Sequence, residues 1–404
     1  MIYNKPMKKK IAACTVALSI MITAGCAFAG CKKAESYGKR IFSMGAYATL
    51  AASKSDISQE EYDNLYERVR TFLTRTDNSI SSVMSTSYIY KFNMAEAGAT
   101  VEVDKTSYEI LSLAKQIYVQ TDGYFNPAVW YNEDLYGFLN HSAAELEGMP
   151  YMREWVGENE DRYLPLPDEK YVTAFRELSG CFGEVELNED NGRYYAVKPG
   201  KTVTVEGDSN VYSLRIDLGG IGKGWCADKV NQMMTEEGIG YGYFSFSESS
   251  MSLKKYNGNR SGNYTLMLRD PRGVFGSPFA SVSVSGENLS TSGDHLQYYY
   301  VDGVRYSHII DPVTGSPVQT GIASVTIIGG SAAEADALTT ALAAMGKQKA
   351  VEYINQNLSD CKVIMLIIEN DSGKIITNCP KKIKIENSAY KITNTVEGGK
   401  IVLE

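Results

Sequence analysis

A glycine-dense segment from Ile216 to Gly224 is the first place where this sequence could bind phosphate. It holds four glycines and a lysine and leads into a predicted helix. Backbone amides at the N-terminus of a helix attract anions. The segment is not a P-loop, which would need glycine at Asp217 and a hydroxyl at Gly224, and the dinucleotide-binding pattern fails at Trp225. A strand-to-helix turn that simply needs glycine is the competing interpretation.

Two side chains with oxygen atoms, Asp336 and Thr340, lie one helical turn apart in an alanine-rich segment. Residues at this spacing share one face of a helix. A carboxylate and a hydroxyl there suit a hard cation such as Mg²⁺ better than zinc. For an isolated pair, a solvated aspartate and a threonine bonded to the helix backbone are the more common finding.

His308 is one of only three histidines and lies between a predicted strand and a turn at Pro312. An imidazole titrates near neutral pH, so His308 could act as a general base or acid. A histidine bonded to a turn carbonyl is the alternative. The segment from Ser290 to Asp294 is predicted to be a hydroxyl-rich turn that could donate to phosphate or ribose, although most such segments are surface turns.

Helices and strands must position these groups. Ser58, Thr106 and Ser331 are each followed three residues later by glutamate, which predicts three capped helix starts. A further helix is predicted from Gly224 to Glu237. Strands are predicted at 241–246, 264–268, 281–284, 297–301, 324–328 and 363–368, with a hairpin turn at Asp302-Gly303. The pattern indicates an α+β fold with much antiparallel pairing. Residues 130–166 are predicted to be an irregular loop, a lid or a linker.

The N-terminus resembles an export signal, because Lys8 to Lys10 precede the apolar stretch Ile11 to Gly30. Cys26 and Cys31 each follow Ala-Gly, as in a bacterial lipobox. We expect Cys31 to be the lipidated residue, with Cys26 as the alternative, and the chain to be held at the extracytoplasmic face of the membrane. A retained transmembrane anchor is the other interpretation.

The remaining composition is that of an ordinary globular protein. The 404 residues carry a net charge of -8, which argues against a nucleic-acid partner. Four cysteines beyond the signal are too widely separated for a zinc or redox motif, and a disulfide is left open; they are Cys181, Cys226, Cys361 and Cys379.

Taken together and in this order, the segments resemble the ApbE family of FAD:protein FMN transferases, from about Phe42 to Gly346. The resemblance implies a T-fold-like α+β domain of mixed, largely antiparallel sheets packed with helices. It also implies that FAD is bound and its pyrophosphate attacked, that FMN is joined to a threonine of an acceptor protein, and that AMP is released. The acceptors would be extracytoplasmic flavoprotein subunits of a membrane redox complex.

The resemblance also implies roles for individual residues. His308 would be the base that activates the threonine, and the Gly220 carbonyl, Asp336 and Thr340 would hold Mg²⁺. Residues expected to contact FAD are Met44, Tyr124, Phe125, Asn126, Asp217, Lys223, Thr291 and Ile310. Ser87 and Phe92-Asn93 fit a weaker signature.

Several positions depart from the family pattern. Asn126 replaces an aspartate, Ala128 a threonine and Val83 an aromatic residue, while Ser247-Glu248 stands where paired glycines are expected. Gly222 in place of alanine is a mild change. Because these departures concern the flavin wall, we expect altered affinity or acceptor choice and not lost chemistry.

We therefore predict a signal peptide at 1–30, a linker at 31–40, a flavin transferase domain at 41–380 and a C-terminal extension at 381–404. Two other functions stay open. Water could attack in place of threonine, which would make the chain an FAD diphosphatase that gives FMN and AMP. Alternatively, the chain could be a non-catalytic flavin-binding lipoprotein.

Overall fold

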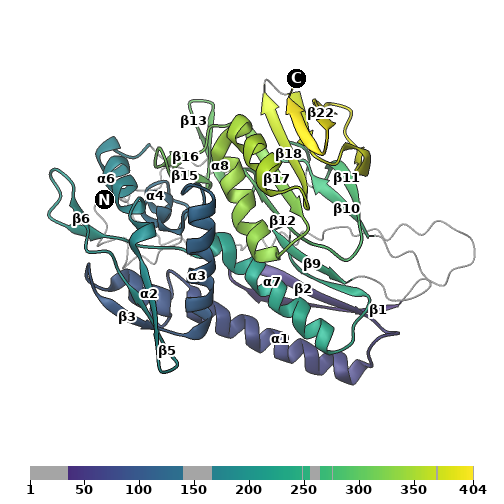
Figure 1. Cartoon of the computed structure of the whole chain (residues 1–404), viewed down its shortest axis with the longest axis horizontal. Helices are drawn as coiled ribbons and strands as arrows, with labels where there is room; N and C mark the ends of the chain where they lie inside the picture. The colour runs from purple at the N-terminus through teal and green to yellow at the C-terminus, as the bar shows by residue number, and fades with distance from the viewer. Residues whose placement is uncertain are drawn as a thin grey trace, which may run out of the picture.

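A nine-stranded sheet forms the centre of the molecule (Figure 1). The computed structural model describes residues 35–139, 166–247, 249–254, 264–274, 276–369 and 372–403. All neighbouring strands in this sheet are antiparallel except β19 and β21, which are parallel. In spatial order the strands are β1 (Ser36–Ser43), β2 (Ala46–Ser53), β8 (Gly242–Phe246), β9 (Ser250–Lys254), β12 (Asn288–Gly293), β17 (Ile322–Ile328), β18 (Lys362–Glu369), β19 (Ser372–Thr377) and β21 (Tyr390–Ile392).

Three long helices cover one face of this sheet: α1 (Gln59–Ile80), α7 (Gly219–Glu236) and α8 (Ala332–Asn357). Apolar residues of these helices join those of β2, β8 and β17 in the largest core cluster. Helices α7 and α8 meet at Gly224, where a Cβ atom would lie 2.2 Å from the Ala332 carbonyl oxygen. Glycine at this position therefore sets the distance between the two helices that carry the candidate site.

A small three-stranded sheet covers the opposite face. It consists of β10 (Tyr264–Arg269), β11 (Pro278–Val284) and β20 (Ile383–Ile385). Its inward side chains form a second core with residues such as Met251 and Ile364 of the central sheet. Because this second core fills the opposite face of the central sheet, the candidate site lies on the helical face.

The remaining elements pack beside the helical face. Helices α2 (Tyr88–Met94) and α3 (Lys105–Gln120) adjoin the sheet of β3 (Thr100–Val103), β5 (Arg193–Val197) and β4 (Glu186–Asp190). A third, aromatic-rich core joins the last group of elements. These are α4 (Trp130–Leu135), α6 (Glu169–Ser179), the hairpin β6 (Thr202–Thr204) and β7 (Val211–Ser213), and the hairpin β13 (Tyr298–Val301) and β14 (Val304–Ser307). Short pieces complete the fold: η1 (Pro127–Val129), η2 (Phe182–Glu184), β15 (Ile310–Asp311), β16 (Ser316–Pro317), η3 (Pro380–Lys382), β22 (Asn394–Glu397) and β23 (Lys400–Leu403).

The α+β class and most predicted elements are confirmed, with three corrections. Ser58 and Ser331 cap α1 and α8 as predicted, but α3 is capped by Asp104, whose carboxylate accepts from the Ser107 amide, and not by Thr106. Helix α7 begins at Gly219, five residues before the prediction, because the glycines form its first turn. The predicted turn at Ser290 is strand β12, in the middle of the sheet.

The first and last strands that the structure describes pair within the fold. Strand β1 starts at Ser36, inside the segment predicted as a linker, and β20 and β21 pair with other strands although they follow residue 381. Cys26 and Cys31 lie outside the described residues. Among the helices that the structure describes, none has the length and apolarity needed to span a bilayer.

Candidate active site

Asp336 occupies the centre of the candidate site, on the first turns of α8. Its side chain is 3% exposed. One carboxylate oxygen accepts from Ser290 Oγ at 2.8 Å and the other from the Gly224 amide at 3.0 Å. Within the described ranges no lysine or arginine pairs with Asp336. A buried carboxylate surrounded only by neutral donors carries an uncompensated charge, which favours binding of a cation.

The Gly220 carbonyl belongs to the turn of α7 that contacts this carboxylate through the Gly224 amide. In a helix the amide of residue 224 faces the carbonyl of residue 220. Because the same Gly224 amide donates to Asp336, both oxygens adjoin one amide. Thr340 lies one turn beyond Asp336, and its hydroxyl is 3.1 Å from Ser292 Oγ. The donor set is therefore all oxygen, as Mg²⁺ prefers, and the residues present fit the implied ion.

Strand β12 presents its hydroxyl groups on both faces of the sheet. Side chains alternate along a strand, so Ser290 and Ser292 face α8 while Thr291 faces the other side of the sheet. Thr291 Oγ1 lies 2.9 Å from Thr326 Oγ1 on β17. Ser290 contacts Asp336, and Ser292 contacts Thr340. The alternation of side chains along a strand would predict that these two serines share a face, but only if the segment is recognised as a strand.

Asp217 is anchored by the N-terminal half of the chain. Its carboxylate accepts from Ser82 Oγ at 2.5 Å and from the Gly219 amide at 2.6 Å. The side chain of Asn93 holds Ile216, the residue before Asp217. Its Nδ2 donates to the Ile216 carbonyl at 2.9 Å, and its Oδ1 accepts from the Ile216 amide at 2.8 Å. The weaker signature at Phe92-Asn93 thus positions the start of α7.

Lys223 lies on the first turns of α7, and its ammonium donates to the Gly219 carbonyl at 2.7 Å. Its charge lowers the pKa of His308 and partly offsets the raised pKa of Glu133. Burial is the main cause of that raised pKa, followed by the charge of Asp217. Glu133, on α4, was not predicted as a site residue, and no motif in the sequence pointed to it.

Met44 forms the tip of the β1–β2 hairpin, where its φ of 52° and the 71° of Gly45 make a tight turn. Its amide donates to Asp77 Oδ2 at 2.8 Å. A Cβ atom on Gly222 would lie 2.9 Å from Met44 Cε and 2.7 Å from Ile80 Cδ1. Glycine in place of alanine at residue 222 therefore lets Met44 approach α7.

The segment from Tyr124 to Asn126 meets the same helix. Phe125 is buried, and its ring lies 3.4 Å from where a Cβ of Gly220 would be. The Tyr124 hydroxyl accepts from Lys349 Nζ at 2.5 Å. Phe125 is thus placed beside the proposed metal ligand, whereas Tyr124 points to the second half of α8.

Asn126 uses both ends of its side-chain amide inside the protein. Nδ2 donates to the Ser179 carbonyl at 3.0 Å, and Oδ1 accepts from the Ala128 amide at 2.9 Å. An aspartate could make only the second bond. The substitution of asparagine is therefore matched to its surroundings.

The other departures have different structural consequences. Ser247 has a φ of 43°, so it keeps a backbone conformation that glycine adopts most easily. Its hydroxyl donates to the Tyr47 carbonyl at 2.7 Å. Val83 is exposed and Ala128 is buried, while Glu248 lies outside the described residues.

His308 follows strand β14 and faces a backbone carbonyl. Its amide donates to the Gln297 carbonyl at 3.1 Å, and Nδ1 lies 3.4 Å from the same oxygen. Burial lowers the pKa of His308 to about 4, and the charge of Lys223 adds to this effect. The imidazole is therefore neutral at pH 7, as a general base must be. Ile310, two residues on, is buried in the aromatic-rich core.

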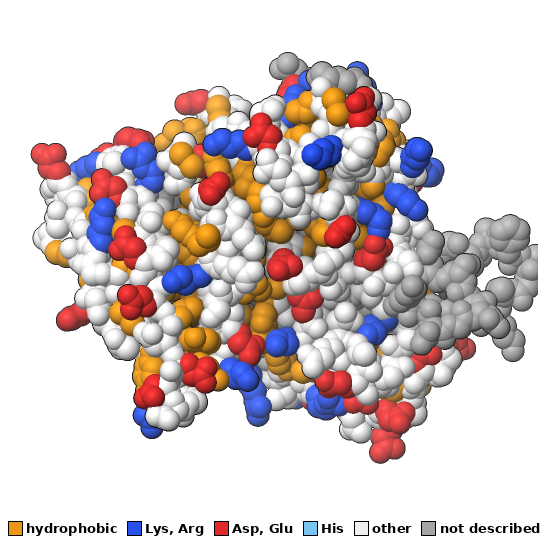
Figure 2. Space-filling model, viewed as in Figure 1, with side chains coloured by type: hydrophobic (Ala, Val, Ile, Leu, Met, Phe, Trp, Pro, Cys, Tyr) orange, Lys and Arg blue, Asp and Glu red, His pale blue; other side chains and the backbone are white. Residues whose placement is uncertain are grey.

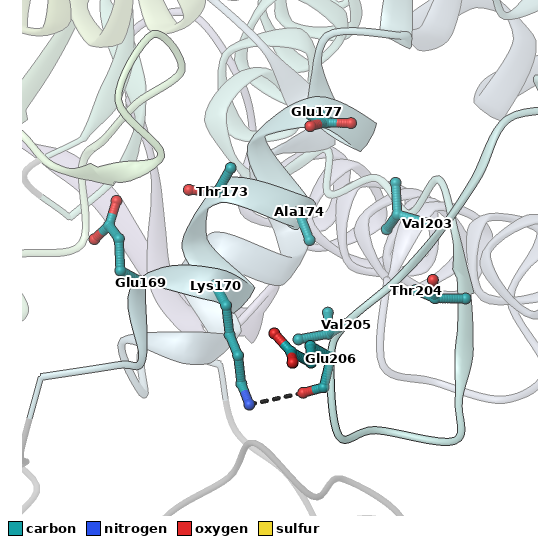
Figure 3. A pocket seen from close by; sticks show the side chains of 9 residues that line it. All are labelled: Glu169, Lys170, Thr173, Ala174, Glu177, Val203, Thr204, Val205 and Glu206. Carbon is teal, nitrogen blue, oxygen red and sulfur yellow. Dashed lines mark hydrogen bonds between the residues drawn. The ribbon is translucent and has the colours of Figure 1, made fainter.

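A separate pocket lies between α6 and β6 (Figure 3). It has a volume of about 380 Å³ and is lined by acidic and apolar residues that include Glu169, Glu177 and Val205. None of the predicted site residues lines it, so it is not the candidate active site.

The four cysteines in the described residues form no disulfide. All four in the described ranges are free thiols, so the disulfide left open by the sequence does not form. In the same part of the chain no cluster of three or more His, Cys, Asp or Glu side chains could hold a metal. A cation at Asp336 would therefore depend on hydroxyl and carbonyl oxygens.

Comparison with known proteins agrees with this arrangement. The family model described as "ApbE family" matches residues 44–365. The FAD:protein FMN transferase of Treponema pallidum is 30% identical over 298 residues, which are 72% of this chain and 74% of that protein. The Escherichia coli K12 enzyme of the same name is 26% identical over 323 residues, or 80% of this chain and 82% of that protein.

Solved structures show the same fold. The crystal structure of the ApbE protein from Thermotoga maritima has a TM-score of 0.66 and 26% identity, and the match covers 82% of this chain and 94% of that one. The flavin transferase ApbE from Vibrio cholerae has a TM-score of 0.65 at 22% identity, covering 85% and 97%. The fold and site define an α+β protein of the flavin transferase class. The chain belongs to the ApbE family.

Proposed function

We propose that this chain transfers FMN from FAD to a threonine hydroxyl of an acceptor protein and releases AMP, with Mg²⁺ as its cofactor. The observation that carries this proposal is the buried Asp336 carboxylate, which has no cationic partner in the described ranges and accepts from the Gly224 amide on the first turns of α7. Its relatives named FAD:protein FMN transferase support the reaction class.

In this reaction the threonine oxygen attacks the phosphorus on the FMN side of the FAD pyrophosphate. A new phosphoester bond forms, the bond to the AMP oxygen breaks, and the hydroxyl proton moves to His308. The Gln297 carbonyl favours a proton on Nδ1, so Nε2 keeps the lone pair that accepts the proton. Asp336, Thr340 and the Gly220 carbonyl would hold Mg²⁺, which when bound supplies positive charge to the pyrophosphate oxygens.

The other charged groups bind and orient FAD. The Lys223 ammonium adds positive charge beside His308, and the first amides of α7 lie next to Asp217. Met44 and Phe125 approach α7 from two directions, and their apolar side chains suit the flavin ring. Acceptors would be flavoprotein subunits of a membrane redox complex, and Cys31 would hold the chain at the outer face of the membrane.

One assay separates transfer from the two other functions. The protein is incubated with FAD, Mg²⁺ and a synthetic peptide that carries one threonine between small and acidic residues. We expect the peptide to gain the mass of one FMN while AMP appears. AMP without a peptide adduct would mean that water is the acceptor, and retained FAD with neither product would mean a flavin-binding protein.

A further inference from the structure

The hairpin β13–β14 has two unlike faces. Tyr299 and Tyr306 point into the aromatic-rich core, where their rings stack at 5.7 Å. On the opposite face, Tyr298 and Tyr300 are each 43% exposed. Exposed aromatic side chains of this kind are enriched where proteins bind other proteins.

Arg305 holds these two exposed tyrosines in place. Its guanidinium lies 3.7 Å from the centre of the Tyr298 ring and donates to the Tyr300 hydroxyl at 2.7 Å. A third bond, at 3.2 Å, joins it to the Asp294 carbonyl at the end of β12. Because the side chains are already ordered, a partner would lose little conformational entropy by packing on them.

Within the described residues, no strand pairs with the outer edge of β13. Among the described strands β13 pairs only with β14, and the turn at Asp302-Gly303 makes Val301 and Val304 a hydrogen-bonded pair. The backbone groups of Tyr298 and Tyr300 therefore point away from β14. The equivalent outer edge of β14 is used, since Gln319 donates to the Arg305 carbonyl at 2.9 Å.

The open edge leads to the proposed base. Tyr298 pairs with Ser307, and the Gln297 carbonyl accepts from the His308 amide. Ser307 is 2% exposed, and in the part of the chain that the structure describes no group pairs with its hydroxyl. A buried hydroxyl without a partner is unfavourable, so a polar group brought to this end of the hairpin would be favourable.

We propose that an extended segment of the acceptor protein docks on this hairpin, pairs with the open edge of β13 and packs its alternate side chains on Tyr298 and Tyr300. This inference rests on the proposed function, because the acceptor must bring a threonine to His308. Pairing of an extended segment with a free strand edge gives affinity through the main chain and selectivity through alternate side chains.

Peptide binding tests the docking surface independently of turnover. The full-length chain in detergent, saturated with FAD, is titrated into the labelled threonine peptide described above, and Kd is read from fluorescence anisotropy. We expect the double variant Tyr298→Ser, Tyr300→Ser to raise Kd by about tenfold or more. Tyr300→Pro, which removes an outward amide, should weaken binding more than Tyr300→Ala, which removes only the ring.

Val402→Ser is the matched control, because Val402 is 40% exposed on the hairpin β22–β23. It should bind the peptide as the wild type does, and FAD affinity should be unchanged in all variants. Equal Kd values for the wild type and the double variant, or no binding by the wild type, would overturn the docking surface. Peptide binding without FMN transfer would instead contradict the proposed function and leave the surface standing.

Discussion

The residues of the site are held mainly by neutral hydrogen bonds, and this leaves charges for a ligand. Asp336 accepts from a serine and an amide, and Asp217 accepts from a different serine and amide. Neither carboxylate forms a salt bridge within the described ranges. Such an arrangement is poor for stability alone but suits a protein that binds a cation and a pyrophosphate.

Removal of the Asp336 charge should abolish Mg²⁺-dependent turnover. Asp336→Asn keeps the size of the side chain but loses the only carboxylate of the donor set, so we expect the rate to fall by on the order of a hundredfold or more. Glu334→Gln is the control, since it removes a carboxylate from the same helix outside the donor set. AMP release by Asp336→Asn at the wild-type rate would refute the metal assignment.

His308 should titrate far below an ordinary histidine. Its pKa of about 4 in the folded chain lies below 6.5, so the unfolded chain binds the extra proton between these values. The contribution of His308 to stability is therefore fully present above pH 6.5 and is lost as the pH falls toward 4. NMR titration of the three imidazoles measures this directly, and Lys223→Met should raise the pKa of His308. A wild-type value near 6.5 would contradict the lowered pKa of His308.

His308→Gln should separate FAD binding from FMN transfer. The variant should bind FAD normally while FMN transfer is lost, because a glutamine amide cannot accept the threonine proton as the His308 imidazole would. Normal transfer would remove His308 from the mechanism.

Asn126→Asp tests whether a departure from the family pattern is compensated. The change places a carboxylate against the Ser179 carbonyl in place of a donor. We expect the free energy of unfolding to fall by about 1–3 kcal/mol, as measured by urea denaturation. If the variant is as stable as the wild type and binds FAD more tightly, asparagine at this position is a defect of the flavin wall.

At the scale of elements, the site depends on how closely α7 and α8 approach. Asp228 of α7 accepts from the Ser331 hydroxyl and from the first two amides of α8, at 2.7 to 3.0 Å. The Gly224 amide then meets Asp336 about one turn further along α8. Helix α7 therefore caps α8 and also presents an amide to the carboxylate that we propose as a metal ligand.

Gly224→Ala should separate these helices. The added Cβ would lie 2.2 Å from the Ala332 carbonyl, and a backbone atom cannot give way cheaply. We expect a loss of about 1–3 kcal/mol of stability together with weaker Mg²⁺ binding. Gly38→Ala on the edge strand β1, where no atom lies within 4 Å of the new Cβ, is the control. Equal melting temperatures for the two variants would contradict the close-packing argument.

The sequence predicted elements better than contacts. Amphipathic spacing and serine caps located α1 and α8, and the four ordered motifs identified the family. Strand β12 was missed because its serines, threonine and glycine are typical of turns, and burial in the sheet overrides that local preference. For the same reason Thr291 was chosen and Ser290 and Ser292 were not. Glu133 and Gln297 could not be predicted, because the interaction of Glu133 with Lys223 and the contact of Gln297 with His308 arise only in the folded chain.

At the scale of the whole molecule, two halves of the chain meet at one site. The N-terminal half contributes Met44, Phe125 and the anchor of Asp217, while the C-terminal half contributes Asp336 and His308. Figure 2 shows positive and negative side chains interspersed over the face that it presents. That face therefore shows no single large charged region to which a partner could bind.

The lipobox-like segments at Cys26 and Cys31 predict that the whole chain is attached to the membrane. In cell fractionation we expect Cys31→Ala to move the protein from the membrane to the soluble fraction, while Cys26→Ala leaves it in place. The reverse result would identify Cys26 as the lipidated residue. Retention of the double variant in the membrane would indicate an uncleaved N-terminal anchor.

The stoichiometry of transfer tests the central claim most directly. AMP and the peptide adduct are quantified together over a time course with FAD and Mg²⁺. The account predicts that one peptide gains FMN for each AMP released, and that both products disappear in Asp336→Asn. AMP that accumulates without adduct, or adduct formation that survives the loss of Asp336, would contradict it.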